Sequence, residues 1–443
     1  MLLRFSFENF RSFKGKTTLA LVASSQTTLN DVLIRKGEKD SKSSYRLLPS
    51  AVIYGPNASG KSNVILAMQT LRGIVAQGSI VQSQLWPMAN LELFPFVHGA
   101  AQRDDLSPIS FEVDFITADG HHFLYTLTIE VALLGESTPR TITDEKLIRI
   151  RGKTAIELFH RKEDAIEIGD QAAEILGYNA LEMLQLKTSV TQNMDAETLF
   201  LTGGFKSSIR KAVADRVIGY ITDEILATTD FSKTLQTQSV TLEYKTQGEP
   251  INPDDDFVQL SLLDAFKSAA DFGPQQIGFK SVDMPNKKRA WMMASVYKNV
   301  LIPAYSMESE GTIKLLNFVF ALLAGFDGGK LLMIDEMDTA IHPELVKGIV
   351  ALFGNPEFNK AGAQLVFTTH NPSYLDNKLL RRDQILFTER DPDTYESSLY
   401  SLKDFGSVNV RNDQSYMQNY FKGRYGRLPY IDFEALLAHE MGA

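Results

Sequence analysis

The chain has 443 residues and no cysteine, and its 45 basic and 54 acidic side chains give a formal net charge of −9 at pH 7. This length predicts about two or three compact units, and ordinary shares of hydrophobic and charged residues, 44% and 22%, exclude disorder over most of the chain. The negative charge excludes a general binder of polyanions, and the lack of cysteine excludes a disulfide framework, a thiol nucleophile and a thiolate zinc site.

Charges interrupt the N-terminus where a signal peptide needs an unbroken apolar core. The longest apolar stretch, residues 315–326, has about twelve residues and contains Asn317, whereas a membrane-spanning helix needs about 20. We therefore expect a soluble cytoplasmic protein with no membrane partner.

Residues 1–25 predict a strand, a turn and a second strand. Apolar and polar side chains alternate in the first part, and Gly15 supplies a turn before the strand expected at 17–22. Residues 26–48 are polar and poor in large apolar groups, which indicates an exposed loop.

The middle of the chain changes between strand and helix patterns. Residues 51–54 form a short apolar strand, and residues 63–76 carry apolar side chains at helical spacing. The alternation typical of β-structure returns from 109 to 150. Residues 165–275 look mostly helical, and no a/d heptad is sustained, which excludes a long coiled coil.

The C-terminal part has the pattern of a parallel sheet. A long apolar helix follows Gly311, and short apolar strands are expected at 330–335 and 364–369, with a helix that starts at Pro343 between them. A succession of strand, helix and strand indicates parallel pairing.

A phosphate-binding pattern is complete at residues 55–62. Gly-Pro-Asn-Ala-Ser-Gly-Lys-Ser matches G-x-x-x-x-G-K-[ST], and it lies between an apolar strand and a helix, as the motif requires. Gly55 and Gly60 let the backbone N–H groups turn toward phosphates, and the start of the helix adds its positive end. Lys61 would reach the outer phosphates and the Ser62 hydroxyl would ligate Mg²⁺.

Two acids, Asp335 and Glu336, end the strand at 330–335. Because side chains alternate along a strand, we expect the two to face different sides, with different tasks. Asp335 would hold the Mg²⁺ shell through water, and Glu336 would orient or deprotonate an attacking water. The alternative, a solvated strand end with incidental acids, is disfavoured by the phosphate loop upstream.

Two further features extend this pattern. His370 follows the strand at 364–369, which we expect beside the strand that carries Asp335, so the imidazole would lie near the γ-phosphate; a purely structural histidine is the alternative. Ser309 can cap the apolar helix, and Gly311 permits close backbone approach. This is either only a cap or a second phosphate-binding helix start that serves a partner subunit.

Five motifs together resemble the SMC/RecF-like branch of the ABC ATPases. They are Asn-Phe-Arg-Ser-Phe at 9–13, the loop at 55–63, Glu-Ser-Glu-Gly-Thr at 308–312, Ile-Asp-Glu-Met-Asp at 334–338 and Thr-Thr-His-Asn-Pro at 368–372. Residues 420–429 resemble the Tyr-x-x-Gly-Arg-Tyr-Gly-x-x-Pro signature of the short RloA-like ATP-binding proteins of abortive-infection and restriction-linked loci. The resemblance covers most of the chain and is vaguest over 165–300.

The resemblance implies an α/β fold: an ABC-type P-loop ATPase head with a mixed sheet and a β-rich N-terminal lobe, plus a helical lobe or insertion. Residues 1–160 would hold the Walker A motif and a β subdomain, and residues 161–300 a mostly helical insertion. Residues 301–443 would carry the signature helix, the Walker B motif, the switch histidine and the C-terminal part of the head.

The resemblance also assigns roles to individual residues. The residues implied to bind ATP are Asn57, Ala58, Ser59, Gly60, Lys61, Ser62 and Asn63. Those implied to hold Mg²⁺ are Ser62 and Asp335, and Glu336 would be the general base, Asp338 the start of the D-loop and His370 the switch histidine. The signature offered to the opposing subunit would be Ser309, Glu310, Gly311 and Thr312, which departs from the usual Leu-Ser-Gly-Gly.

Several other features carry weaker signals. Gln82 and Gln84 are candidates for the Q-loop, although an ordinary polar loop is an equal interpretation. The adjacent pair His121 and His122 faces opposite ways on a strand, which disfavours a metal site. Asp391-Pro392-Asp393 favours a turn over a nuclease motif. The basic runs at 287–291 and 422–427 are typical of solvated faces, although the second coincides with the family signature.

We therefore expect a dimeric ATPase, or a higher oligomer, with ATP sites shared between subunits. The resemblance implies phage defence, in which the nucleotide state controls a separately encoded effector, a TOPRIM-like nuclease, since too few residues follow His370 for the nuclease domain of OLD-type relatives. A RecF-like DNA-repair ATPase and a slow ATP-dependent scaffold that sequesters a partner are the alternatives. Nucleic acid is a candidate partner that the charge does not strongly indicate.

Overall fold

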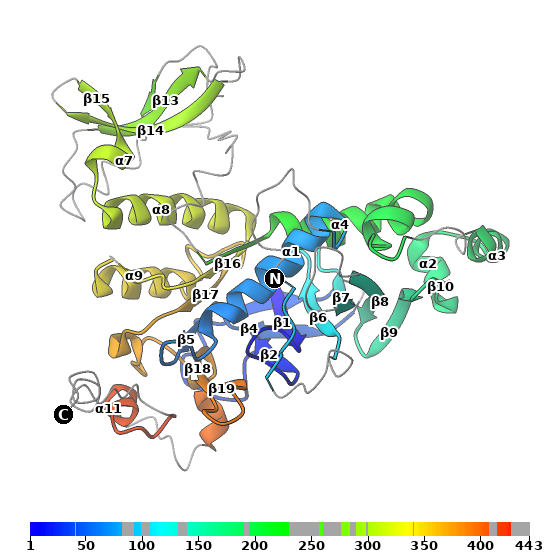
Figure 1. Ribbon diagram of the computed structural model, residues 1–443, viewed down its shortest axis with the longest axis horizontal. Coiled ribbons are helices and arrows are strands. Elements are labelled where there is room, and N and C mark those ends of the chain that lie inside the picture. Colours follow the sequence, from blue (N-terminus) through cyan, green and yellow to red (C-terminus); the bar gives the residue numbers. More distant parts are fainter. Residues whose placement is uncertain are drawn as a thin grey trace, which may run out of the picture. The chain divides into compact units, whose positions relative to one another are not determined.

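The computed structural model of the protein (Figure 1) describes residues 1–39, 41–81, 93–98, 107–131, 140–189, 195–229, 257–259, 276–283, 289–297, 300–339, 341–406 and 414–426. The chain divides into two compact units. Unit 1 comprises Met1–Thr229, Ala324–Met337 and Pro343–Ala443, and unit 2 comprises Asp230–Leu323 and Asp338–His342.

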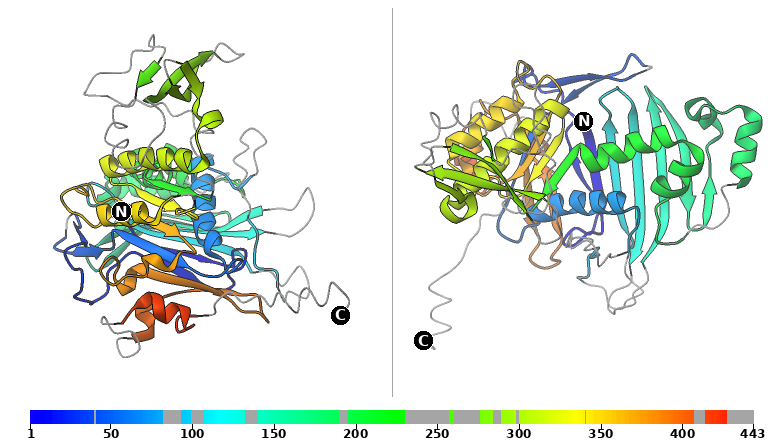
Figure 2. Two further views of the ribbon diagram at one scale, coloured as in Figure 1. Left: turned by 90° about the vertical axis from the view of Figure 1, so that its left-hand side faces the viewer. Right: turned by 90° about the horizontal axis from the view of Figure 1, so that it is seen from above.

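Unit 1 contains an antiparallel seven-stranded sheet in the order β10-β9-β8-β7-β6-β1-β2. Its strands are β1 (Leu2–Glu8), β2 (Thr17–Ala20), β6 (Ile109–Ile116), β7 (His122–Val131), β8 (Arg140–Arg151), β9 (Thr154–Lys162) and β10 (Ala165–Glu167). Helices α1 (Lys61–Gln77) and α4 (Lys211–Asp223) lie across one face of this sheet (Figure 2). The Tyr220 ring of α4 stacks on Phe115 of β6 with centroids 4.0 Å apart. The expected β-rich N-terminal lobe is present.

The second sheet of unit 1 is mixed, in the order β11-β16-β17-β5-β18-β19. It is formed by β5 (Ser50–Tyr54), β11 (Ile225–Thr228), β16 (Leu331–Ile334), β17 (Gln364–Thr368), β18 (Ile385–Arg390) and β19 (Ser397–Ser401). The first five strands of this order pair in parallel and only β18–β19 is antiparallel. Every residue of β5, β16 and β17 is buried, as expected of parallel strands covered on both faces.

The two helices that the sequence predicted around the strand of Asp335 are present, and one of them connects two parallel strands. Helix α8 (Glu310–Gly328) precedes β16, and α9 (Pro343–Phe353) lies between β16 and β17 in the chain. By length and composition alone α8 could cross a membrane, which is weak evidence because the core helix of a soluble protein passes the same test. In unit 1, Phe326 packs its ring 4.8 Å from that of Phe353, as expected of a core helix.

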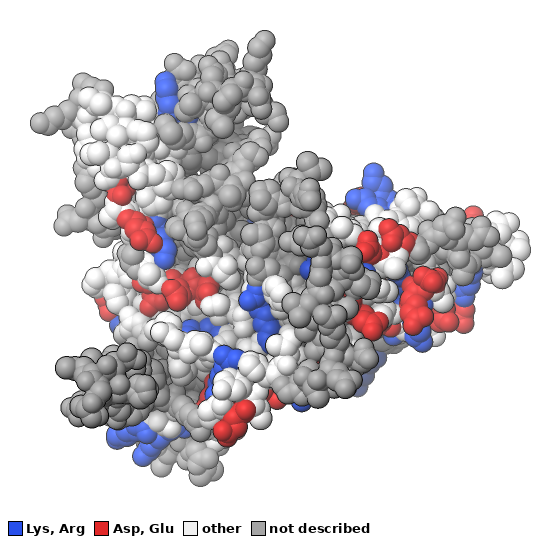
Figure 3. Space-filling model, viewed as in Figure 1, with Lys and Arg blue, Asp and Glu red and all other residues white. Residues whose placement is uncertain are grey.

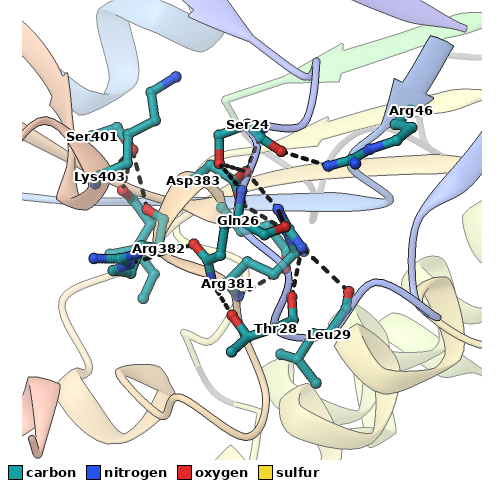
Figure 4. Close-up of polar contacts among 12 residues, drawn as sticks. Ser24, Gln26, Thr28, Leu29, Arg46, Arg381, Arg382, Asp383, Ser401 and Lys403 are labelled. Atoms are coloured by element: carbon teal, nitrogen blue, oxygen red, sulfur yellow. Dashed lines mark hydrogen bonds and ion pairs between the residues drawn. The ribbon is translucent and has the colours of Figure 1, made fainter. Parts of the chain in front are cut away.

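A buried arginine attaches the N-terminal segment to the mixed sheet (Figure 4). The Arg381 side chain is fully buried, and its Nε and Nη2 donate to the two carboxylate oxygens of Asp383 at 2.9 and 3.0 Å. The same guanidinium donates to the carbonyls of Gln26 and Thr28, and Asp383 accepts from the backbone N–H and hydroxyl of Ser24. The bidentate pair therefore satisfies backbone groups of a segment without regular structure.

The region predicted as an exposed loop at 26–48 also contains a small hairpin. Strands β3 (Ile34–Gly37) and β4 (Ser44–Leu47) pair antiparallel. Each has only four residues and carries charged side chains, so the apolar positions Ile34, Tyr45 and Leu47, which pack together against Leu3 and Ile116, form too short a pattern to indicate strands.

The described part of 161–300 is less helical than predicted. In unit 1 this range contributes short helical segments, namely η2 (Asp170–Ala172), α2 (Ala173–Leu176), α3 (Ala180–Ser189), the π-helix η3 (Leu201–Ile209) and α4. In unit 2 it contributes an antiparallel sheet of β12 (Phe257–Gln259), β13 (Gln276–Asp283), β14 (Arg289–Tyr297) and β15 (Val300–Pro303). A Pro-Asn pair at 285–286 separates two apolar runs, and this hairpin signal outweighs the helical pattern. The short α7 (Ala304–Met307) follows β15.

The remaining described elements lie near the C-terminal part of the mixed sheet. They are η4 (Pro372–Tyr374), η5 (Arg382–Gln384), η6 (Leu402–Phe405) and α11 (Tyr416–Phe421). On the face shown in Figure 3, basic and acidic side chains of the described residues are interspersed.

Candidate functional site

The phosphate-loop residues connect β5 to α1, as the motif requires. Gly60 has φ +107° at the start of α1, and Ala58 also has a positive φ of +60°. A Cβ on Gly55 would lie 2.4 Å from Thr388 Oγ1, so no larger residue fits there without displacement. The Ser59 hydroxyl bonds to the Thr388 hydroxyl at 2.6 Å, which attaches the loop to β18. Glycine is therefore needed in this loop for both space and backbone conformation.

Lys61 is folded against the loop it belongs to. Its side chain is buried, and Nζ donates to the carbonyls of Gly55 and Pro56, both at 2.9 Å. Burial lowers the pKa of Lys61 to about 8, and the charges of Asp335 and Glu336 oppose this shift. The two carboxylates therefore act on the same ammonium that would meet the outer phosphates.

The two acids do not divide between opposite faces of a strand as predicted. Strand β16 ends at Ile334, so Asp335 and Glu336 begin a turn and strand alternation does not apply. Glu336 has a φ of +44°, a conformation that costs free energy in a residue with a Cβ. The turn leaves Asp335 half-buried and Glu336 exposed, while both carboxylates influence Lys61.

His370 is the second residue after β17, which lies beside β16 in the sheet, as predicted, with β5 on its other side. The side chain is exposed. The residue before it is anchored, because Thr369 N donates to the carbonyl of Ile53 at 3.1 Å, and its hydroxyl accepts from Asn371 N at 2.8 Å. The phosphate loop, the two acids and His370 therefore follow the carboxyl ends of parallel strands of one sheet, the edge at which such sheets bind ligands.

Residues of the motif at 9–13 and of β19 also hold the phosphate loop and the start of α1 in place. Asn63 donates to the Ser12 hydroxyl at 2.8 Å, and Ser397 bonds to the same hydroxyl at 2.8 Å. The Phe13 ring and the Ser397 hydroxyl lie 3.0 and 2.8 Å from where a Cβ on Gly60 would be. Ser12 and Phe13 belong to the motif at 9–13, which could have indicated this role, whereas no sequence signal marks Thr388 or Ser397.

The donor set offered at this edge suits Mg²⁺. Ser62 is exposed in the first turn of α1, and Asp335 is half-buried at the end of β16. A hydroxyl and a carboxylate provide the hard oxygen ligands that Mg²⁺ prefers, with room for water in the rest of its shell. No soft ligand competes, since the chain has no cysteine. These two residues therefore fit the predicted metal role.

The signature residues lie in unit 2, at the start of α8. The Ser309 hydroxyl accepts from Thr312 N at 3.1 Å and bonds to the Thr312 hydroxyl at 2.9 Å, which confirms the predicted cap. Glu310 is exposed, and Gly311 is half-buried. Asp338, predicted to begin the D-loop, also belongs to unit 2.

The two adjacent histidines make separate structural pairs. His121 pairs with Asp119 at 2.9 Å, and the buried His122 bonds to Asp114 at 2.5 Å and to the Tyr45 hydroxyl at 3.1 Å. His121 precedes β7 and His122 begins it, so strand alternation does not apply to the pair, and the two side chains bind different partners.

One group among the described residues has metal-ligand spacing, namely Glu157, His160 and Glu167. Lys146 Nζ lies 3.5 Å from Glu157, and His160 bonds to Asp144 at 2.6 Å, so two of the three residues already have partners within the protein.

The remaining predicted features are structural where the chain is described. Asp391 accepts from the backbone of Asp393 and Thr394 at 2.9 and 2.8 Å, which confirms a turn. Tyr420 of the C-terminal signature stacks on Phe387 of β18, and Tyr425 packs on the same ring. Lys422 and Arg424 are exposed. The positions outside the described residues are Gln82, Gln84, Lys287, Lys288 and Arg427.

Residues 50–184 and 296–376 match the family described as AAA domain, putative AbiEii toxin, Type IV TA system. These segments make up just under half of the chain and include the phosphate loop, the signature, both acids and His370. No curated protein matches the chain. The family match supports an ATPase of the AAA/ABC type and of the abortive-infection-like kind, with ATP binding and hydrolysis as its activity.

Proposed function

We propose that this protein is an ABC-type ATPase whose loop at 55–62 binds ATP with Mg²⁺ and whose Glu336 activates the attacking water. The observation that carries the proposal is that the loop with Lys61 and the pair Asp335 and Glu336 follow the carboxyl ends of β5 and β16, two strands in the parallel part of one mixed sheet. A phosphate loop, a cation and paired acids are the parts that phosphoryl transfer to water requires.

Each residue has a task in this reaction. The loop N–H groups, the start of α1 and Lys61 hold the outer phosphates and stabilise the charge that spreads over them in the transition state. Glu336 accepts a proton from water while the water oxygen bonds to the γ-phosphorus and the bond to the ADP oxygen breaks. His370 orients the γ-phosphate. Mg²⁺, held by Ser62 and Asp335, neutralises phosphate charge when bound.

We infer that the site is completed by a second copy of the chain, so that a homodimer is the minimal active form. Supporting this, Ser309 caps a helix of 19 residues whose N-terminus belongs to a different unit from Lys61. A capped helix start with a glycine beside it suits contact with an anion. The opposing subunit would provide Ser309, Glu310, Gly311 and Thr312.

The biological role that we propose is anti-phage defence in the cytoplasm. The nucleotide state would regulate a separately encoded effector, a TOPRIM-like nuclease, and the family match to a type IV toxin–antitoxin domain supports a protein partner. The formal charge of −9 gives no support to a function that begins with binding plain DNA.

A complementation experiment tests the shared site. Lys61→Ala and Gly311→Arg chains should each be inactive as ATPases, because one lacks the phosphate cation and the other obstructs the signature. After demonstrated subunit exchange, the mixture should recover activity, since each heterodimer has one site with both parts intact. Hydrolysis by wild-type monomers at high dilution would contradict the shared site.

A second experiment tests the partner. Purification of the tagged protein expressed with its neighbouring genes should retain an effector in a nucleotide-dependent manner. Strong nucleotide-dependent binding to plain double-stranded DNA with no protein partner would instead favour the RecF-like repair function. A partner held in all nucleotide states, with very slow turnover, would favour the scaffold.

A further inference from the structure

Thr368, the last residue of β17, joins the turn that carries both acids to the neighbouring strand. Its side chain is completely buried. The hydroxyl oxygen lies 2.5 Å from Asp335 Oδ1 and 2.8 Å from the backbone N of Glu336. The Thr368 carbonyl also accepts from Met337 N at 3.3 Å. Three consecutive residues after β16 are therefore bonded to one threonine.

The direction of each of these bonds follows from the number of protons. The Glu336 N–H can only donate, so the Thr368 hydroxyl oxygen accepts there. The single hydroxyl proton then goes to Asp335, which accepts it as a carboxylate in a charge-assisted bond. One oxygen of Asp335 is thereby oriented by the protein, and the other would be the ligand for the metal.

The same hydroxyl supports the left-handed conformation of Glu336. At a φ of +44°, the Glu336 N–H does not continue the ladder between β16 and β17, whose last pair is Ile334 with Phe367. The Thr368 hydroxyl supplies the acceptor that the ladder no longer provides. The backbone conformation that aims the Glu336 side chain therefore depends on a group in another strand.

We propose that Thr368 is a positioning residue of the ATPase site, which sets the metal-facing oxygen of Asp335 and the direction of Glu336 through one hydroxyl. The inference rests on the proposed ATPase function and adds a residue to it. Thr368 touches neither phosphate nor water in this scheme and acts through the two acids.

Two variants of Thr368 separate the hydroxyl from the packing. Thr368→Val keeps the shape of the side chain but removes both hydroxyl bonds. Thr368→Ser keeps the hydroxyl and removes a methyl group.

The matched control is Thr117→Val in the turn between β6 and β7. The Thr117 hydroxyl also donates to an aspartate, Asp119, at 2.5 Å and accepts a backbone N–H, that of His121, at 3.0 Å. It is equally inaccessible, at 3% exposure. Thr117→Val therefore removes a buried threonine hydroxyl with the same kinds of hydrogen bond, but at a position that belongs to none of the ATPase-site motifs.

The decisive measurement is metal binding in a complex with a non-hydrolysable ATP analogue, followed by Mn²⁺ electron paramagnetic resonance. Thr368→Val should bind the analogue without metal as wild type does, because the contacts of Lys61 are unchanged. Its Mn²⁺ affinity should fall by about 10- to 100-fold, the usual effect of removing a partner of a metal ligand. Thr368→Ser and Thr117→Val should keep the wild-type Mn²⁺ affinity.

Several results would overturn the inference. One is a Thr368→Val protein with wild-type metal affinity and turnover; another is a Thr368→Ser protein as impaired as Thr368→Val, since packing alone would then explain the loss. If Thr368→Val does not fold, Thr368→Ala takes its place, because it also removes both hydroxyl bonds, and wild-type Mn²⁺ affinity in Thr368→Ala would overturn the inference. A wild-type protein that binds no metal–nucleotide complex would refute the proposed function itself, and the inference with it.

Discussion

ATP binding should weaken with rising pH because the Lys61 ammonium loses its proton near pH 8. The pKa of Lys61 is lowered to about 8 by burial, from 10.5. Bound phosphates favour the charged form and return the pKa toward its ordinary value. Binding should therefore be coupled to proton uptake, and affinity should decrease as pH rises through the pKa of the free protein.

The size of the effect follows from the two pKa values. With about 8 in the free protein and about 10.4 with phosphate bound, the ATP affinity should fall by about 20-fold between pH 7.5 and pH 9.5. In this range the γ-phosphate is largely ionised, since the second pKa of a phosphate monoester is about 6, so the nucleotide contributes less to the slope than Lys61 does. The lowered pKa of Lys61 also affects the stability of the protein. The folded protein binds the Lys61 proton less tightly than the unfolded chain does. The contribution of Lys61 to the free energy of unfolding therefore rises with pH between about 8 and 10.5.

Isothermal titration calorimetry with a non-hydrolysable analogue measures both quantities. Titrations in buffers of different ionisation enthalpy give the proton uptake, which should be about half a proton near pH 8. Lys61→Arg is the matched control, because a guanidinium stays protonated over this range and its affinity should not change with pH. A flat pH profile in the wild type, or an equal slope in Lys61→Arg, would refute the reasoning.

Three further predictions test the base, the loop and the buried arginine. Glu336→Gln should bind ATP normally in calorimetry and lose turnover by about 10²–10⁴-fold, since an amide cannot accept the proton of water. Gly55→Ala should abolish ATP binding, because its Cβ would lie 2.4 Å from a neighbouring hydroxyl, whereas Gly37→Ala, with no atom within 4 Å, should bind as wild type; equal affinities would contradict the packing argument. Arg381→Met should lower the free energy of unfolding by about 3–5 kcal/mol in denaturant titrations, because it leaves the buried Asp383 carboxylate without its partner. Adding Asp383→Asn should recover part of that loss, and additive losses would show that the pair is not coupled.

The sequence by itself predicted those features of the site that depend on residues close together in the chain. The pattern at 55–62, the cap at Ser309 and the buried strands around Asp335 and His370 were all predicted. The structure confirms the strand before the loop, the helix after it and the parallel pairing of β16 with β17. These features depend on residue periodicity and on the backbone chemistry of glycine and serine, which act over a few neighbouring residues.

Sequence patterns did not predict the short hairpin at 34–47 or the sheet of unit 2. The strands β3 and β4 have four residues each and carry charged side chains, and their apolar residues Ile34, Tyr45 and Leu47 pack against Leu3 and Ile116 from other strands. Their pairing is therefore set by neighbours in space, and no local period reports it.

Only the tertiary structure decided how the acids are held. Strand alternation predicted opposite faces for Asp335 and Glu336, but the strand ends at Ile334 and the Thr368 hydroxyl fixes the turn that follows. Thr388 likewise reaches the phosphate loop from β18. Both threonines come from distant parts of the chain, and their contacts exist because the sheet places β17 between β16 and β5, and β18 on the other side of β5. Hydrogen bonds between strands depend on sheet order, which hydrophobic patterning of single segments does not specify.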